Sequence, residues 1–368
     1  MIVYLVTILI ILIVGILYLN SEAKTQRSYR RQYIVFVSIL LILQSGLRNW
    51  AVGADTFAYY EGFERVKSYS WADILDNMSE YYLYGIGKDP GYAVFEKVVQ
   101  YILPHYQLFL ILIAVIFFLA LGNFIYRNTN RLSDAVLAYV LYSCLFFAFF
   151  SITGIRQTIA TAAALYGYEL IKKRKIVPFI LLILLASTIH RSVLIFIPFY
   201  FIATMKKTKL YYVGALLLFP VLMAYKTTFS RFLKEWSGYE DYGVNESAGT
   251  FTFTLMLLFV AAMALWRMKT VIRQNEATRQ FYNAFILALL FTPLTWVNPS
   301  AMRMVQYYSI FMLVLLPDVV KSFQFESRTF RKTVYMVAII VLIALFAKSN
   351  INNEYKFFWQ QMELGENY

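Results

Sequence analysis

IVPFILLILLASTIHRSVLIFIPFYFIATM, residues 176–205, is a long apolar run that one polar stretch, Ser187–Ser192, interrupts near its middle. Basic clusters flank the run at Lys172–Lys175 and at Lys206–Lys209. One straight helix would place the two clusters on opposite sides of a bilayer, whereas Lys and Arg concentrate in cytoplasmic loops. The segment therefore predicts a helical hairpin that enters and leaves the membrane on the same side.

The two legs of this hairpin are short. Each has about 14 residues, or about 21 Å of helix, against about 30 Å of hydrocarbon. His190 and Arg191 at the tip are therefore expected below the membrane surface. Ionisable groups at that depth are costly unless they line a polar cavity, so they are functional candidates. The alternative is a histidine that is only hydrogen-bonded within the bundle.

The composition of the whole chain agrees with a membrane protein. Of the 368 residues, 60% are hydrophobic and 15% charged, whereas soluble domains are about half apolar and about a quarter charged. The net charge of +13 would suit nucleic acid only if the basic residues formed one soluble face. They occur instead in short runs between apolar segments, which is typical of membrane topology. No nucleic-acid partner is expected.

Cutting the chain at its polar stretches predicts about twelve transmembrane helices. They cover residues 1–20, 33–47, 106–126, 135–150, 156–171, 176–189, 192–205, 210–226, 251–267, 281–297, 304–320 and 333–347. The predicted fold is an all-α polytopic membrane protein that forms a single integral membrane domain over 1–368.

Alternate connections hold most of the basic residues, which predicts that these connections are cytoplasmic. Both termini are then outside. The opposite set includes the two longest connections, 48–105 and 227–250, which we expect to be the major extracytoplasmic loops. Long polar loops on one face are where function is expected.

The first outer loop begins at Arg48 and contains Asp55 and Tyr60. Further along, Asp89-Pro90-Gly91-Tyr92 predicts the start of a helix, with Asp as N-cap and Pro at the first helical position. This helix is too short to cross the bilayer, so it is predicted to lie in the interface or to re-enter the membrane. Asp89 is a candidate site residue, and its alternative role is that of a simple cap.

Four arginines lie on outer segments, where cations are least expected. They are Arg48, Arg156, Arg191 and Arg303. A lone arginine there is often a snorkelling anchor, but several guanidinium groups together match the geometry of a lipid diphosphate. Gln157 and Tyr307 lie next to or one turn after two of these arginines and complete the candidate site.

The sequence has no Gly-rich phosphate loop, no Cys/His cluster with zinc spacing and no Asp-x-Asp pair on an outer loop. We therefore expect neither a metal nor another cofactor. The alternative is that Asp55 and Asp89 together hold one ion.

Taken in order, these motifs resemble the EpsG family of Wzy-like polysaccharide polymerases over about residues 45–310. The residues that carry the resemblance are Arg48, Gly53-x-Asp55-Thr56-x-x-x-Tyr60, Asp89-Pro90-Gly91-Tyr92, Arg156-Gln157, His190-x-Ser192 and Arg303. Asp89 stands where the family pattern more often has Glu.

The resemblance implies polymerisation of undecaprenyl-diphosphate-linked oligosaccharide repeats into O-antigen, exopolysaccharide or capsule at the outer face of a bacterial cytoplasmic membrane. It also implies a glycosyltransferase C-like (GT-C) architecture with outer loops and short interfacial helices. A flippase and a chain-length regulator are possible protein partners. Such chemistry needs positive charge at the leaving diphosphate and a base for the attacking hydroxyl. His190 is the first candidate base, because an imidazole usually titrates near pH 6.5, and Asp55 is the second.

Three other functions remain open from the sequence. A lipid-linked oligosaccharide flippase has a similar number of spans, but transporters usually carry a pseudo-repeat and polar groups on both faces. A membrane acyltransferase would use His190 on a sugar hydroxyl and would need a polar route for its acyl donor. A ligase would break the same bond and differ from a polymerase only in its acceptor.

Overall fold

The computed structural model describes residues 2–20, 26–53, 55–237, 250–323, 328–349 and 354–361. This described part is almost entirely helical and contains no β-strand, apart from one isolated bridge between Arg48 and Phe357. The predicted all-α fold is therefore confirmed.

The chain forms two compact units. Unit 1 comprises Met1–Leu194 with Phe325–Tyr368, and unit 2 comprises Ile195–Gln324. Each unit combines short polar connections with apolar helices. The single membrane domain over 1–368 stays a prediction.

Unit 1 holds most of the long helices. They are α1 (Ile2–Asn20), α2 (Gln26–Gly46), α3 (Thr56–Ser68), α4 (Trp71–Tyr84), α5 (Pro90–Gln100), α6 (Tyr106–Asn128), α7 (Leu132–Leu145), α8 (Ile155–Lys172), α9 (Ile176–Ile189) and α17 (Arg328–Ser349). α6 packs against α2 and α8, and α8 packs against α9. α6 is much more buried than the equally apolar α1, so it forms the centre of this bundle.

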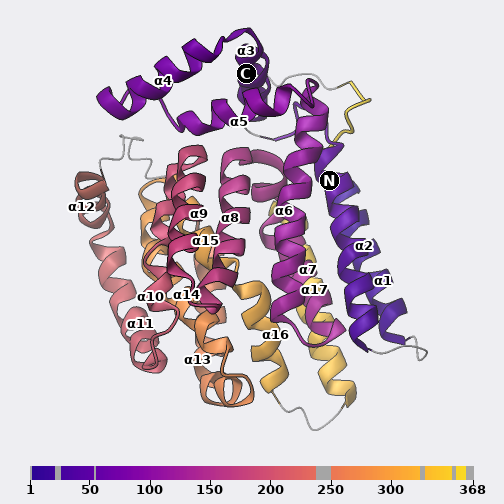
Figure 1. Ribbon diagram of the computed structural model, residues 1–368. Helices are drawn as coiled ribbons and strands as arrows, with labels where there is room; N and C mark the ends of the chain where they lie inside the picture. The colour runs from indigo at the N-terminus through magenta and orange to yellow at the C-terminus, as the bar shows by residue number, and fades with distance from the viewer. Residues whose placement is uncertain are drawn as a thin grey trace. The chain divides into compact units, whose positions relative to one another are not determined.

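The helices α3, α4 and α5 form a separate layer beyond the ends of the unit 1 bundle (Figure 1). α4 begins with a capping box in which Ser70 and Asp73 satisfy each other's backbone N–H groups. The Lys97 ammonium on α5 donates to three carbonyls at the end of α3, including that of Tyr69 at 2.7 Å. These contacts fix α5 against its neighbours.

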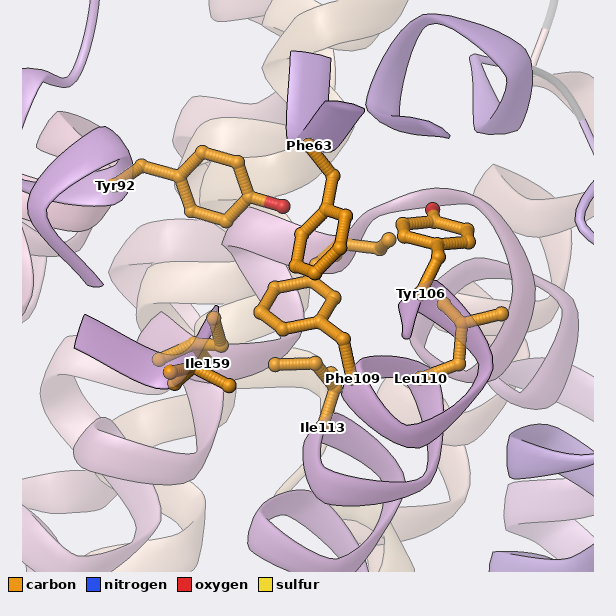
Figure 2. Packing of buried hydrophobic residues seen from close by; sticks show 9 residues of the cluster. Phe63, Tyr92, Tyr106, Phe109, Leu110, Ile113 and Ile159 are labelled. Atoms are coloured by element: carbon orange, nitrogen blue, oxygen red, sulfur yellow. The ribbon is translucent and has the colours of Figure 1, made fainter. Parts of the chain in front are cut away.

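An apolar cluster joins this outer layer to the bundle. Phe63 of α3 and Tyr92 of α5 pack on Phe109 of α6, with ring centroids 5.0 and 6.4 Å apart respectively (Figure 2). Phe63 and Phe109 are fully buried. At about 25 cal/mol per Å² of buried apolar surface, such rings are the main term that holds the layer in place.

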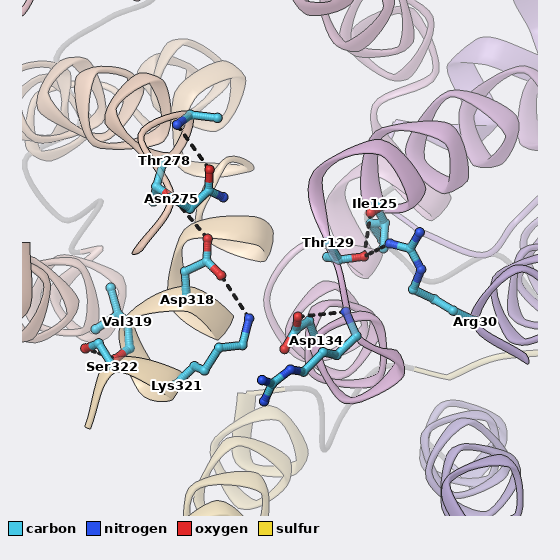
Figure 3. Close-up of polar contacts among 12 residues, drawn as sticks. Arg30, Ile125, Thr129, Asp134, Asn275, Thr278, Asp318, Val319, Lys321 and Ser322 are labelled. Carbon is cyan, nitrogen blue, oxygen red and sulfur yellow. Dashed lines mark hydrogen bonds and ion pairs between the residues drawn. The ribbon is translucent and has the colours of Figure 1, made fainter. Parts of the chain in front are cut away.

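The basic connections of unit 1 lie at one end of its bundle. Arg30 of α2 donates to the Thr129 hydroxyl (Figure 3). Arg30 also donates to the Tyr126 carbonyl, and Lys172 donates to Asn128. At the other end, Asn49 bonds to Gln360, and the Tyr4 ring packs on Tyr355. The alternation read from the sequence is thus present within unit 1, and which end faces the cytoplasm stays a prediction.

Unit 2 contains shorter and bent elements. They are α10 (Phe199–Ile202), α11 (Thr208–Ala224), α12 (Lys226–Ser237), α13 (Phe251–Gln274), α14 (Thr278–Phe291), α15 (Met302–Ser309) and α16 (Met312–Ser322), with 3-10 turns at Thr292–Trp296 and Pro299–Ala301. The second leg of the predicted hairpin is not one helix, because a 3-10 segment, Arg191–Phe196, precedes α10. The first leg, 176–189, coincides with α9.

Polar contacts also link the basic connections of unit 2 to one another. Thr278 and Lys321 both bond to Asp318, which joins the start of α14 to the end of α16 (Figure 3). Arg279 donates to the carbonyl of Lys206. Three connections with basic residues therefore meet at one end of unit 2, as the charge pattern predicts.

Three helices in the described residues, α1, α6 and α13, are long and apolar enough to cross a membrane. The number rises to five if two bent pairs are each one span: α11 with Lys226–Leu233, bent by 94°, and Pro299–Ser309 with α16, bent by 55°. Several other apolar helices are shorter, including α7 and α9. The membrane character is thus supported, while twelve spans and a GT-C architecture stay predictions.

Candidate functional site

Asp89 lies at the centre of a buried ionic cluster. It occupies the N-cap position of α5 with φ 48°, ψ 57°, in the left-handed region, and its side chain makes no capping hydrogen bond. One carboxylate oxygen, Oδ2, instead meets Arg156 Nη1 at 2.9 Å and His190 Nδ1 at 3.2 Å. The Asp-Pro helix start is confirmed, but the alternative of a simple cap is wrong.

His190 reaches this carboxylate because it follows α9 directly. It is the C-cap of α9, in extended conformation, and is 4% exposed. The backbone N–H of Arg191 donates to the other oxygen of Asp89 at 3.0 Å, while the Arg191 side chain is exposed. The tip of the predicted hairpin therefore closes over Asp89 with one ring and one backbone donor.

Arg156 enters the cluster from the first turn of α8. Its guanidinium carbon lies 5.6 Å from the ring centroid of Tyr59 and 5.8 Å from that of Tyr92, a distance suited to cation–π attraction. More than two-thirds of the Arg156 side chain is buried, and its Nε has no hydrogen-bond partner among the described residues. The rings and the carboxylate hold a cation that is partly withdrawn from water.

The pKa of Asp89 reflects these partners. Burial acts to raise it, but the hydrogen bond and charge of His190, the charge of Arg156 and the Arg191 N–H together hold the pKa of Asp89 below its usual range. Asp89 is therefore a carboxylate at neutral pH. An ionised carboxylate on Nδ1 favours the proton on that nitrogen and the lone pair on Nε2.

A second carboxyl, Glu96, lies about two helical turns after Asp89 on α5 and is 2% exposed. It interacts with Tyr92 and Arg156, and it makes no ion pair within the described residues. Burial raises the pKa of Glu96 to about 8, although Tyr92 and Arg156 act to lower it. Glu96 was not among the residues that the sequence indicated.

Gly91 allows α5 to approach the end of α9. A Cβ at this position would lie 2.5 Å from the Thr188 Cβ and 2.9 Å from the Thr188 carbonyl carbon. Non-bonded carbon atoms do not approach each other this closely, so only glycine fits at position 91 without a shift of its neighbours. The close approach is what brings Asp89 within reach of His190, because these two residues flank Gly91 and Thr188.

We expect Gly91→Ala to lower stability by about 1–3 kcal/mol, as overpacking does, and to separate Asp89 from His190. Thermal unfolding of the detergent-solubilised protein measures the first effect. Gly62→Ala is the matched control, because Gly62 lies inside α3 with open space around it and alanine favours helix. Equal stability of the two variants would contradict the packing of α5 on α9.

The raised pKa of Glu96 has a consequence for stability. Glutamate in an unfolded chain ionises near pH 4.3, so the unfolded state releases a proton that the folded state keeps up to about pH 8. The contribution of Glu96 is complete below the unfolded pKa and is lost as pH rises through the folded pKa. By pH 7 this costs on the order of 3–4 kcal/mol.

Glu96→Gln should therefore melt higher than the wild type at pH 7.5, with a difference that shrinks toward pH 5. Scans of thermal unfolding between pH 5 and 8.5 measure this. Glu61→Gln, an exposed change on α3, is the control and should follow the wild type throughout. A difference between Glu96→Gln and wild type that is the same at every pH would refute the buried, protonated carboxyl.

Arg48 has a different environment from Arg156. It is 4% exposed, and its guanidinium donates to the carbonyls of Ser45 at 2.6 Å and Ile152 at 3.1 Å. Ile152 belongs to a π-helical turn, Phe149–Thr153, just before Arg156. Arg48 thereby satisfies one carbonyl of this irregular turn and one near the end of α2, and it helps to position the start of α8.

The other predicted residues of unit 1 lie in separate environments. Asp55 is exposed, with φ 64°, and its side chain makes no hydrogen bond or ion pair in the described structure. Tyr60 stacks on Trp50 with ring centroids 4.9 Å apart, so it is a packing residue in this arrangement. Gln157 is 2% exposed and follows Arg156 on α8.

Arg303 and Tyr307 lie on α15 in unit 2. Arg303 is half-buried and Tyr307 fully buried. Within unit 1 the structure brings together Asp89, Arg156 and His190, with the backbone of Arg191 and the ring of Tyr92. No group of three or more His, Cys, Asp or Glu suited to a metal occurs among the described residues.

Apolar helices of membrane-spanning length, together with a buried cluster of ionisable side chains, define an integral membrane protein with a polar site in unit 1. The sequence profile of the EpsG family matches residues 31–362. The chain therefore belongs to the EpsG family, which is a family of Wzy-like polysaccharide polymerases. Comparison with curated proteins and with solved structures gave no match.

Proposed function

We propose that the protein polymerises oligosaccharide repeat units linked to undecaprenyl diphosphate, at the outer face of the cytoplasmic membrane. Membership of a polysaccharide polymerase family supports the reaction class, and that family acts on lipid-linked oligosaccharide in a membrane. The observation that carries the site assignment is the contact of Asp89 with both Arg156 and His190.

In this proposal Arg156 binds the diphosphate of the donor. Its guanidinium already has a bound carboxylate, so the site can hold an anionic oxygen at that fork. As the anomeric C–O bond breaks, negative charge develops on the leaving diphosphate. A fixed, partly buried cation stabilises that charge more in the transition state than in the ground state.

His190 acts as the general base. A hydroxyl of the acceptor sugar attacks the anomeric carbon and gives its proton to Nε2, while the lipid diphosphate leaves with the bonding electrons. Asp89 holds the ring through Nδ1 and stabilises the imidazolium that forms. A single direct displacement of this kind inverts the anomeric centre.

The remaining residues have lesser roles in the proposal. Arg48 positions the turn before Arg156, and the Arg191 backbone positions Asp89. Asp55 is the alternative base, and Arg303 stays a candidate diphosphate ligand that its own alanine variant tests. No step requires a metal ion, since Arg156 supplies the charge at the leaving group.

Purified protein incubated with a synthetic lipid-diphosphate oligosaccharide tests the function, with the products sized by electrophoresis. A ladder of chain lengths is the expected result. A single transfer to a second acceptor would indicate a ligase, and unchanged glycan would contradict the proposal and favour a transporter.

A further inference from the structure

Glu96 is a buried acid that the proposed mechanism does not use. It is 2% exposed, makes no ion pair in the described structure, and its Oε1 has no hydrogen-bond partner there. Acidic residues are almost never fully buried unless they are paired, and a buried polar group without a partner needs an explanation. The inference below rests on the proposed function.

Three titratable groups interact with Glu96. They are Tyr92 on α5 itself, Arg156 on α8 and Tyr106 at the start of α6. From α3, Tyr59 interacts with Tyr92 and Tyr106. From α9, His190 reaches Asp89, and within the described residues α4 brings no titratable group to Glu96.

Other buried polar atoms near Glu96 also lack hydrogen-bond partners. The hydroxyl of Tyr106 and the Nε of Arg156 are buried and have no hydrogen-bond partner among the described residues. The only cation among them, Arg156, is already paired with Asp89 at 2.9 Å. Arg48 interacts with Tyr106 and Tyr92, and no cation among the described residues forms an ion pair with Glu96.

The charge of this cluster follows from the state of Glu96. With Glu96 protonated, the charges of Asp89 and Arg156 cancel. With Glu96 ionised, the site carries a net negative charge in a region of low dielectric, where repulsion of another anion is strong. A diphosphate would then approach a negative site.

We propose that Glu96 keeps a proton while the lipid diphosphate is bound, so that the site places no second negative charge beside the substrate. Binding of the donor and retention of the proton on Glu96 are then coupled. Loss of this proton weakens binding of the donor, and the bound diphosphate in turn makes the proton harder to remove.

The raised pKa of Glu96, about 8, sets the range in which this coupling acts. If the donor binds only the protonated form, its KM should rise up to about tenfold per pH unit above that value. Glu96→Gln cannot ionise, so its KM should not rise there. A diphosphate diester has no group of its own that titrates near pH 8.

The test is the pH dependence of KM between pH 6.5 and 9.5, with a synthetic polyprenyl-diphosphate-linked oligosaccharide as donor. We expect the KM of the wild type to rise above about pH 8, that of Glu96→Gln to stay level, and that of Glu61→Gln to follow the wild type. Identical profiles for wild type and Glu96→Gln would overturn the proposal.

A second measurement uses the wild type alone. Calorimetric titration with the same donor at pH 8.5, in buffers with different heats of ionisation, counts the protons taken up on binding. Uptake of most of one proton supports the coupling, and no uptake contradicts it. If the wild type binds donor but makes no polymer, the proposed function fails, while the calorimetric count of protons still tests Glu96.

Discussion

Arg156→Ala is expected to lower the rate of chain extension by about 10²–10³-fold, the usual cost of removing one fixed donor to a developing negative charge. The variant loses the proposed hydrogen bonds to the leaving diphosphate. It also leaves Asp89 without its arginine partner. Initial rates of polymer formation at saturating and at low donor concentration measure the effect. Most of the loss should appear in kcat, because the charge on the leaving group grows in the transition state.

Two further variants make this result specific. Arg156→Lys keeps the charge but not the planar fork, so it should recover only part of the activity. Arg127→Ala removes an arginine of similar length that pairs with Glu169 at 3.6 Å and is half-exposed, and it should stay within twofold of the wild type. If Arg127→Ala and Arg156→Ala lost activity equally, Arg156 would have no special role at the site.

His190→Gln is expected to lower kcat by about 10²–10⁴-fold, the range that general bases contribute. Glutamine can still donate to Asp89 but cannot accept a proton at neutral pH, so packing is kept and basicity is lost. The chain has only one other histidine, His105, which is exposed at the start of α6. His105→Gln is therefore the matched control and should retain full activity.

The pH profile separates this role from a structural one. Wild-type kcat should fall at acid pH as the imidazole becomes protonated, and the residual activity of His190→Gln should lack that limb. An unchanged acid limb in His190→Gln would transfer the role of base to another group, of which exposed Asp55 is the sequence-based alternative.

Local features of the fold could be predicted from sequence because they depend on near neighbours. The Asp-Pro pair marks the start of α5. The cluster Lys172–Lys175 precedes α9, and the polar stretch Ser187–Ser192 marks its end. The alternation of basic loops holds within each unit, since it reflects a constraint that acts on every connection. Span number was harder to predict, because helices such as α7 and α9 are apolar but short.

The pairings of the site could not be predicted. Asp89, Arg156 and His190 were each candidates, but Asp89 is 67 residues from Arg156 and 101 from His190 in the chain. Charge and spacing alone could not show that Asp89 binds both, nor that Arg48 serves backbone carbonyls instead of an anion in this structure. Both outcomes depend on tertiary packing.

Glu96 was missed because glutamate on a short helix is ordinarily solvent-exposed. One signal was available. Glu96 follows Tyr92 by four residues, so both lie on one helix face, and Val99 continues that face as a buried residue. An acidic residue on the apolar face of an amphipathic helix is therefore a signal of a functional site that the local sequence pattern contains.

The proposed mechanism requires the donor diphosphate to bind at Arg156, beside the Asp89–His190 pair. An experimental structure with a non-cleavable phosphonate analogue of the lipid-linked donor measures this directly. The expected result is a phosphate oxygen within hydrogen-bond distance of the Arg156 guanidinium, with His190 Nε2 facing the anomeric carbon. A bound analogue that leaves Arg156 on Asp89 and contacts neither Arg156 nor His190 would contradict the account.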